Sequence, residues 1–171
     1  MILSKICDVY QKWMNRVILF LGLCLMTAVS IQILGRYVPF IPLWLWPEEI
    51  VRVSLVWIIF LGSIVALREK EHFTVDIFSI IMKDKKMPLL RIFLSLLYYF
   101  VGFIIAAVFS YYGFFFFRDW GMIQESDITG LNLGYIYIAI PLAGVSWFVF
   151  LLESLLREFK GESIAAKEVQ L

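Results

Sequence analysis

Histidine and cysteine are scarce in this sequence, which holds one histidine, His72, and two cysteines, Cys7 and Cys24. A single histidine cannot supply both axial ligands of a bis-histidine haem or form a histidine cluster for zinc. Cys7 precedes the first long apolar run and Cys24 lies within it, so we expect no disulfide. The sequence also lacks a Ser/His/Asp set, a glycine-rich phosphate loop and a CxxC motif. We therefore expect no cofactor, no metal site and no enzymatic activity.

Charged residues are also few: they make up 17% of the 171 residues, whereas hydrophobic residues make up 62%. Soluble domains are about 45–50% apolar, and a sphere of this size cannot bury so much apolar side chain. The net charge of +1 indicates no nucleic acid or other polyanionic partner. These values exclude a soluble enzyme, a disordered tail and a free nucleic-acid-binding protein, and they indicate that the solvent is lipid.

Four apolar runs of 18 residues or more are long enough to cross a bilayer. Arg52 is the only charged residue within them. The runs comprise residues 17–34, 50–67, 92–117 and 135–152. Barrel strands are shorter, and a backbone in hydrocarbon must satisfy its own hydrogen bonds, so the runs predict helices. The expected fold class is an all-α integral membrane protein with four transmembrane helices, forming a single domain over residues 1–171.

The first run could instead belong to a cleaved signal peptide, because Lys5, Lys12 and Arg16 precede it. Its 18 residues exceed the apolar segment of about 7–15 residues that signal peptides carry, and no A-x-A cleavage site follows it. We expect it to remain as a helix of the mature protein.

Lysine and arginine residues are distributed unevenly around the four runs. With Arg52 set aside, 12 lie before the first run, around the segment between the second and third, or after the fourth. Only Arg36 and Arg118 lie on the opposite side. Since cytoplasmic loops are enriched in basic residues, the count predicts that both termini are cytoplasmic. Four spans independently require that the two termini lie on the same side. Residues 157–171 are expected to form a cytoplasmic tail.

Two features predict contact with phospholipid head groups. Between the second and third runs, an apolar stripe at helical spacing precedes three lysines. The stripe consists of Phe73, Ile77, Ile80 and Ile81, and the lysines are Lys83, Lys85 and Lys86. This pattern predicts a short interfacial amphipathic helix, with a solvated loop as the alternative. At the opposite interface, Trp44, Trp46 and Trp120 are expected to anchor the chain.

None of the four runs contains an aspartate or glutamate. Proton- and ion-driven carriers usually place such a residue near the bilayer centre. The chain is therefore a poor candidate for a carrier that acts alone. A self-sufficient homodimeric four-span carrier stays as the alternative, although such carriers place a glutamate in the first span. The polar residues of that span here are Thr27, Ser30 and Gln32.

Small residues recur four apart within the second and third runs. Gly62 and Ala66 form one pair, and Gly102, Ala106 and Ser110 form a longer series. Small residues at this spacing allow membrane helices to approach closely. They predict packing between helices of this chain or against another protein.

Charged residues gather at both ends of the second run. Glu48 and Glu49 lie four and three residues before Arg52, so one of them can pair with this arginine and leave the other for a partner. At the other end, Arg68, His72 and Asp76 would share one side of a continuing helix and form a polar ridge, although a solvated loop is the alternative.

Four short segments in this region follow one another in an order that resembles a known family. They read WPEEIVR at 46–52, WIIFLG at 57–62, ALR at 66–68 and HFTVD at 72–76. Together they resemble the signature of the DctQ-type small membrane subunit of TRAP (tripartite ATP-independent periplasmic) transporters. The resemblance is concentrated in residues 46–76, and span number and topology extend it loosely over the chain.

The resemblance implies a non-catalytic subunit in the bacterial inner membrane. In this family a large TRAP membrane subunit carries the substrate and sodium sites, and a periplasmic substrate-binding protein delivers the substrate. The system imports organic acids such as C4-dicarboxylates and sialic acids, and the small subunit is thought to brace the large one. The signature positions would have structural or subunit-interface roles; they are Glu49, Arg52, Gly62, Arg68, His72 and Asp76. The resemblance leaves open whether Glu48 or Glu49 is the family's acidic residue.

Overall fold

The structure, a computed structural model, describes residues 2–38, 40, 42, 44–68 and 88–159. Every regular element in this described part is a helix, and strand pairing is limited to an isolated bridge between Glu125 and Asn132. The elements are α1 (Ile2–Tyr37), α2 (Trp46–Arg68), α4 (Pro88–Phe116), the π-helical turn η1 (Phe117–Gly121), α5 (Gly134–Tyr137) and α6 (Ala139–Phe159). The predicted interfacial helix with Lys83, Lys85 and Lys86 lies outside the described residues, as do His72 and Asp76 of the predicted polar ridge.

Four segments of the described chain are long and apolar enough to cross a membrane, as the sequence predicts. They are Lys5–Tyr37, Trp46–Arg68, Phe93–Gly121 and Gly134–Leu156. The chain is therefore a multi-pass membrane protein with an all-helical fold. The order of span lengths differs from expectation, since the first helix rather than the third is the longest.

Helix α1 begins 15 residues before its apolar run because its polar first turns have one buried face. Lys5, Lys12 and Arg16 are exposed, whereas Cys7 and Met14, two turns apart, are both buried. Residues seven apart fall on the same side of a helix. The basic segment that resembles a signal-peptide lead-in is thus helical and packs against the rest of the protein.

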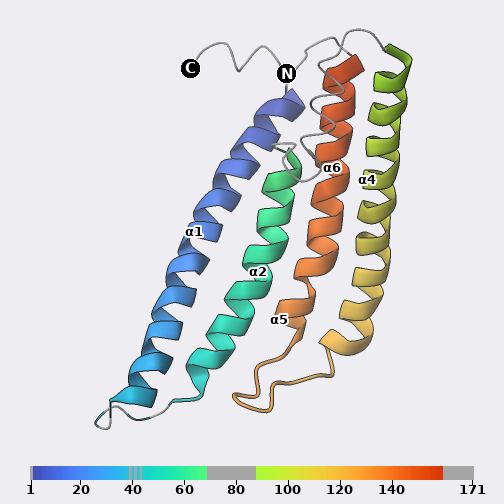
Figure 1. Ribbon diagram of the computed structural model, residues 1–171. Coiled ribbons are helices and arrows are strands. Elements are labelled where there is room, and N and C mark those ends of the chain that lie inside the picture. The colour runs from blue at the N-terminus through green and yellow to red at the C-terminus, as the bar shows by residue number, and fades with distance from the viewer. Residues whose placement is uncertain (1, 39, 41, 43, 69–87, 160–171) are drawn as a thin grey trace, which may run out of the picture.

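The four long helices lie side by side in the order α1, α2, α6, α4 (Figure 1). Helix α1 packs on α2 and helix α4 packs on α6, while α2 and α6 join the two pairs. Burial follows this order: 44% of the span containing α6 is buried, against 6% of the span in α1. The bundle is therefore close to one helix thick, and its outer helices expose large apolar side chains such as Trp13 and Phe100.

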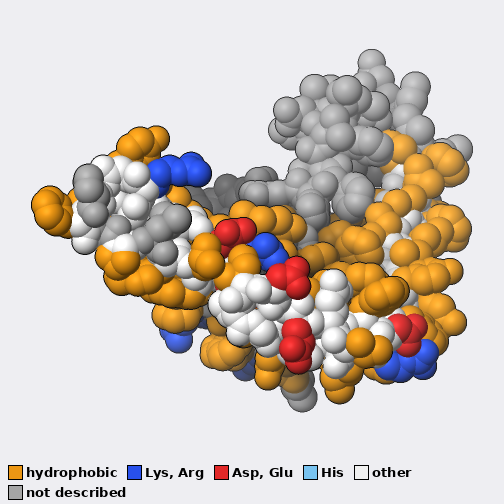
Figure 2. Space-filling model, turned by 90° about the horizontal axis from the view of Figure 1, so that it is seen from below, with side chains coloured by type: hydrophobic (Ala, Val, Ile, Leu, Met, Phe, Trp, Pro, Cys, Tyr) orange, Lys and Arg blue, Asp and Glu red, His pale blue; other side chains and the backbone are white. Residues whose placement is uncertain are grey.

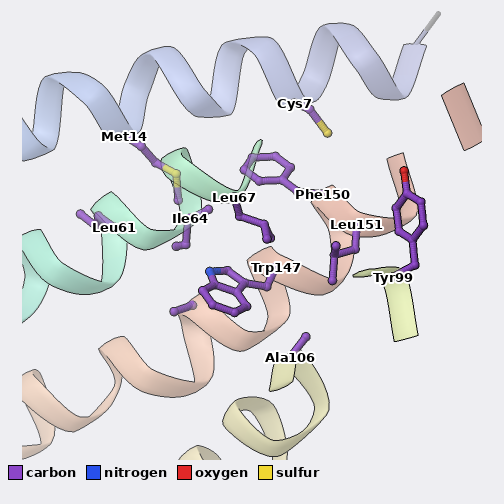
Figure 3. Close-up of a cluster of buried hydrophobic side chains, with 11 residues drawn as sticks. Cys7, Met14, Leu61, Ile64, Leu67, Tyr99, Ala106, Trp147, Phe150 and Leu151 are labelled. Atoms are coloured by element: carbon purple, nitrogen blue, oxygen red, sulfur yellow. The ribbon is translucent and has the colours of Figure 1, made fainter. Parts of the chain in front are cut away.

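The hydrophobic core contains side chains from all four long helices and lies around Trp147, Phe150 and Leu151 of α6 (Figure 3). Ala143 of the same helix also belongs to the core. The members from α1, α2 and α4 are Cys7, Met14, Leu61, Ile64, Leu67, Tyr99 and Ala106. Helix α6 contributes four of the eleven core residues, among them Trp147 and Phe150, and it packs on three neighbouring helices.

Glycine allows the closest helix contact, between α4 and α6. A Cβ on Gly144 would lie 2.5 Å from the backbone nitrogen of Ser110, and one on Gly113 would lie 3.0 Å from that of Pro141. Gly102 faces Leu151 in the same interface, and Ala106 is fully buried there. Gly62 is different, since a Cβ placed on it would meet nothing within 4 Å.

The fourth span is interrupted near its start, where α5 ends at Tyr137 and α6 begins at Ala139. Pro141 has no N–H to donate to the carbonyl one turn earlier, which weakens the helix at this point. The backbone bond from Leu142 N to Ile138 O, at 3.3 Å, carries the chain across the break. The interruption places α5 next to η1 and to α2.

Candidate functional site

Two polar clusters lie at opposite ends of the bundle. The terminal end is the end where α1 begins and α6 finishes, at the top of Figure 1. The loop end carries the 38–45 and 122–133 linkers, at the bottom of Figure 1. Each cluster contains a buried charged residue of α2, and each connects α2 to other parts of the chain.

The terminal cluster is built around Arg68, the last residue of α2, and joins three helices. Its Nη1 donates to the Cys7 carbonyl oxygen at 2.7 Å and to Gln11 Oε1 at 2.5 Å. Its Nη2 donates to Asp8 Oδ1 at 2.6 Å. Its Nε lies 3.5 Å from Glu153 Oε2 of α6. We call these five residues the Arg68 cluster.

Burial makes the Arg68 cluster energetically important. The side chains of Arg68 and Glu153 are only 9% and 5% exposed, and the guanidinium carbon lies 5.2 Å from the centre of the Phe150 ring. Removing one partner of a buried ion pair costs about 3–5 kcal/mol, far more than breaking an exposed pair. Nearby, the Tyr10 hydroxyl and Ser146 Oγ, 2.9 Å apart, add a second polar link between α1 and α6.

The partners of Arg68 are residues that sequence reasoning missed. The predicted ridge of Arg68 with His72 and Asp76 stays a prediction, because the latter two lie outside the described residues. A signal for Glu153 was present: it directly follows the fourth apolar run, at the same membrane face as Arg68. Asp8 carried no such signal, since it lies nine residues before the first run.

The loop-end charges divide into an exposed pair and a buried acid. Glu48 Oε1 lies 3.5 Å from Arg52 Nη2, and both side chains are about half exposed. Glu49 is buried, at 5% exposure, and accepts a hydrogen bond at Oε2 from the Thr129 hydroxyl. The hydroxyl of Ser126 faces the same carboxylate. Glu48 is thus the ion-pair partner of Arg52, and Glu49 is bound by the chain's own 122–133 linker.

The Glu49–Thr129 bond fastens the 122–133 linker onto the first turn of α2. The linker is folded on itself by backbone bonds from Ser126 N to Leu131 O and from Gly130 N to Ser126 O. Gly130 adopts a φ of 71°, which glycine accepts without strain. A further link from α2 to this end is the bond from Trp57 Nε1 to the Tyr135 carbonyl oxygen, at 2.9 Å. The loop end is therefore held together by α2.

Replacing Thr129 by valine tests this attachment. Thr129→Val keeps the side-chain shape but removes the donor to the buried Glu49 carboxylate. We expect this change to lower the free energy of unfolding by about 1.5–3 kcal/mol. Hydrogen exchange of the Ser126 and Gly130 amides should quicken. The matched control is Thr27→Val, because the Thr27 hydroxyl bonds only to the Leu23 carbonyl of its own helix. Equal exchange in both variants would contradict the attachment.

The loop end also contains an open groove between the end of α1 and the start of α2. Its volume is about 460 Å³. Apolar, aromatic and charged side chains line it: Val29, Gln32, Ile33, Arg36, Tyr37, Trp44, Leu45 and Glu48. Figure 2, which views the loop end, shows acidic and basic side chains set among hydrophobic ones. Trp44, Trp46 and Trp120 are all exposed near this end.

Possible metal ligands do not cluster in the described residues. No group of three or more histidine, cysteine, aspartate or glutamate residues that could hold a metal ion occurs among them. The acidic residues of α2 stand in its first turn, and Glu153 stands opposite the last residue of α2. Both clusters therefore lie near the ends of the helices and not at their middle.

Comparisons with known proteins give one matching family model and two similar sequences. The family model for the DctQ component of tripartite ATP-independent periplasmic transporters matches residues 25–161. A Haemophilus influenzae protein described as a TRAP transporter small permease protein is 26% identical over 116 residues, 68% of this chain and 67% of that protein. The sialic acid TRAP transporter permease protein SiaT of H. influenzae is 28% identical over 139 residues, which cover 79% of this chain but 22% of that protein.

Proposed function

Because the chain belongs to the DctQ component family of tripartite ATP-independent periplasmic transporters, we propose that it braces a larger membrane subunit that moves the substrate. A member of this family is a transport component and not an enzyme. In the proposed complex, a periplasmic binding protein delivers the solute and a sodium gradient drives uptake. The chain itself binds neither solute nor sodium.

The observation that carries the bracing role is the placement of charge. In the described parts of the spans, the acidic side chains lie near helix ends and are bound by residues of the same chain. A coupling ion needs a carboxylate or similar ligand inside the membrane, and such residues usually mark ion pathways. Here the buried charges instead bind other parts of the same chain, helices α1 and α6 at one end and the 122–133 linker at the other, which suits a rigid support.

The arrangement of the helices supports the same role. A row of helices has two broad faces, and the outer helices α1 and α4 expose large apolar side chains along them. One such face can lie against a partner while the other meets lipid. The opening beside Gly62 offers a position where a partner helix could approach α2 closely.

The orientation we propose places the terminal end in the cytoplasm of a bacterial inner membrane. Helix α1 begins and α6 finishes at this end, and most lysines and arginines belong to segments that adjoin it. The loop end then faces the periplasm, on the side from which a binding protein delivers solute.

An organic acid is the substrate class that we propose. One relative is named for sialic acid, a carboxylate sugar, which favours this class over cationic solutes. Selection among organic acids would depend on the other subunits, because none of the buried cationic groups described in this chain is free to bind a carboxylate.

The test is reconstitution with and without the partner. The tagged chain, purified from native membranes in mild detergent, should co-purify with a larger membrane protein. Vesicles holding the pair, with binding protein and a sodium gradient, should accumulate an organic acid, and vesicles holding this chain alone should not. Accumulation by the chain alone would favour the homodimeric carrier and overturn the bracing role.

Arg52→Ala is expected to lower recovery of the larger subunit or the transport rate without changing which organic acid is preferred. The Glu48–Arg52 pair is half exposed, so its loss should cost the chain's own stability no more than about 1 kcal/mol. Competition between two organic acids measures the preference, and Arg118→Ala, which removes another exposed pair at the loop end, is the control. A changed preference would place this chain in substrate selection.

A further inference from the structure

We propose that the groove between α1 and α2 at the loop end binds one phospholipid with an amine-bearing zwitterionic head group, such as phosphatidylethanolamine. The groove volume of about 460 Å³ falls within the range of about 300–1,000 Å³ that small-molecule sites have. This site needs only the membrane embedding of the chain and is independent of the proposed transport role.

The lining residues of α1 follow the order of chemical groups in a glycerophospholipid. From the middle of the helix toward its end, the groove presents Val29, then Gln32 and Ile33, then Arg36 and Tyr37. Successive turns are about 5.4 Å apart, so these positions form three levels. The Val29 level, nearest the middle of the helix, suits acyl methylenes. The Gln32 amide can donate to an ester carbonyl, and the Arg36 guanidinium suits the phosphate.

The charges on the two sides of the groove are complementary to a zwitterion. Arg36 has no carboxylate partner in the part of the chain that the structure describes. Glu48, across the groove in the first turn of α2, is half exposed and 3.5 Å from Arg52. A phosphate beside Arg36 and an ammonium group beside Glu48 would each meet the opposite charge, whereas a purely anionic head group would meet Glu48 unfavourably.

Aromatic residues place this groove at the depth of the head groups. Trp44 and Tyr37 both line it and are exposed, and the Trp44 and Trp46 rings lie 6.2 Å apart. Tryptophan and tyrosine concentrate at the membrane–water interface because their rings are amphipathic. The groove is apolar toward the middle of the helices, charged toward their ends and bordered by aromatic rings at the interface. This arrangement matches a lipid better than a water-soluble ligand.

Lipid retention by the purified full chain tests the site. The chain is stripped of lipid in detergent, titrated with phosphatidylethanolamine, phosphatidylcholine or phosphatidylglycerol, and examined by native mass spectrometry. One tightly held phosphatidylethanolamine is expected. Arg36→Gln should weaken its retention about tenfold, since a hydrogen bond between charged groups is lost, and Arg36→Lys should recover part of it. Arg118→Gln, an exposed arginine outside the groove at the same end, should have no effect.

Head-group preference provides a second readout that folding alone would not change. Glu48→Gln should narrow the preference for phosphatidylethanolamine over phosphatidylglycerol, because the carboxylate that attracts the amine is gone. The proposal is overturned if Arg36→Gln and Arg118→Gln lose lipid equally, since the lipid would then be bound non-specifically. It is also overturned if Glu48→Gln leaves the preference unchanged, or if free phosphate displaces the lipid.

Discussion

Arg68→Ala is expected to lower the free energy of unfolding by about 3–5 kcal/mol, the largest effect of any single exposed or buried charge change considered in this chain. The substitution removes four contacts to α1 and α6 at once. It also removes the guanidinium beside the Glu153 carboxylate, which is only 5% exposed. Helix α1 should be affected most, because few of its other contacts reach beyond α2.

Equilibrium unfolding of the purified chain in mixed micelles measures this loss. Arg118→Ala is the matched control, since Arg118 pairs with Asp119 at the surface and its loss should cost about 0–1 kcal/mol. Replacing both buried charges, as Arg68→Met with Glu153→Leu, should restore much of the stability, because apolar substitutes of similar size avoid burying an unpaired charge. Similar losses for Arg68→Ala and Arg118→Ala would show that the Arg68 cluster does not hold the helices together.

Gly144→Ala is expected to destabilise the chain by about 1–3 kcal/mol, although alanine is the better helix former. The added Cβ would lie 2.5 Å from the backbone nitrogen of Ser110 and 2.9 Å from the backbone carbon of Phe109. Backbone atoms cannot rotate away as a flexible side chain can, so α4 and α6 must move apart and lose packing around Trp147.

Gly62→Ala is the control for Gly144→Ala, because the same methyl group would meet no atom within 4 Å. Only helix propensity should then change, so the free energy of unfolding of the isolated chain should stay the same or rise by about 0.5–1 kcal/mol. Unfolding of the two variants under the same conditions compares them directly. If Gly62→Ala cost as much as Gly144→Ala, the close approach of α4 and α6 would not explain the loss.

The four spans could be predicted from the sequence because crossing a bilayer is a local requirement of length and polarity. The order of the helices could not be predicted in this way, since all four runs are similarly apolar and lipid does not distinguish an inner from an outer helix. Gly144 of α6 allows close packing against α4, but this glycine alone does not predict which helix lies beside α6.

The polar clusters show a similar division between local and distant information. The pairing of Arg52 with a residue one turn away was predictable from spacing, although spacing alone could not choose between Glu48 and Glu49. The choice depends on Thr129, 80 residues later in the chain, whose hydroxyl binds Glu49. The partners of Arg68 are likewise distant, since Asp8 lies 60 residues before it in another helix.

A buried charged residue with hydrogen-bond partners lies at each end of the row of helices, and this placement has a mechanical consequence. Apolar side chains in lipid resist separation of helices but resist lengthwise slippage only weakly, because one methyl contact replaces another at similar energy. The Arg68 cluster and the Glu49–Thr129 bond have no equivalent positions one turn away, so a displacement of about 5.4 Å along the bilayer normal would break them without replacement. This resistance to slippage, between α2 and its neighbours α1 and α6 at one end and between α2 and the 122–133 linker at the other, is what the proposed bracing role requires.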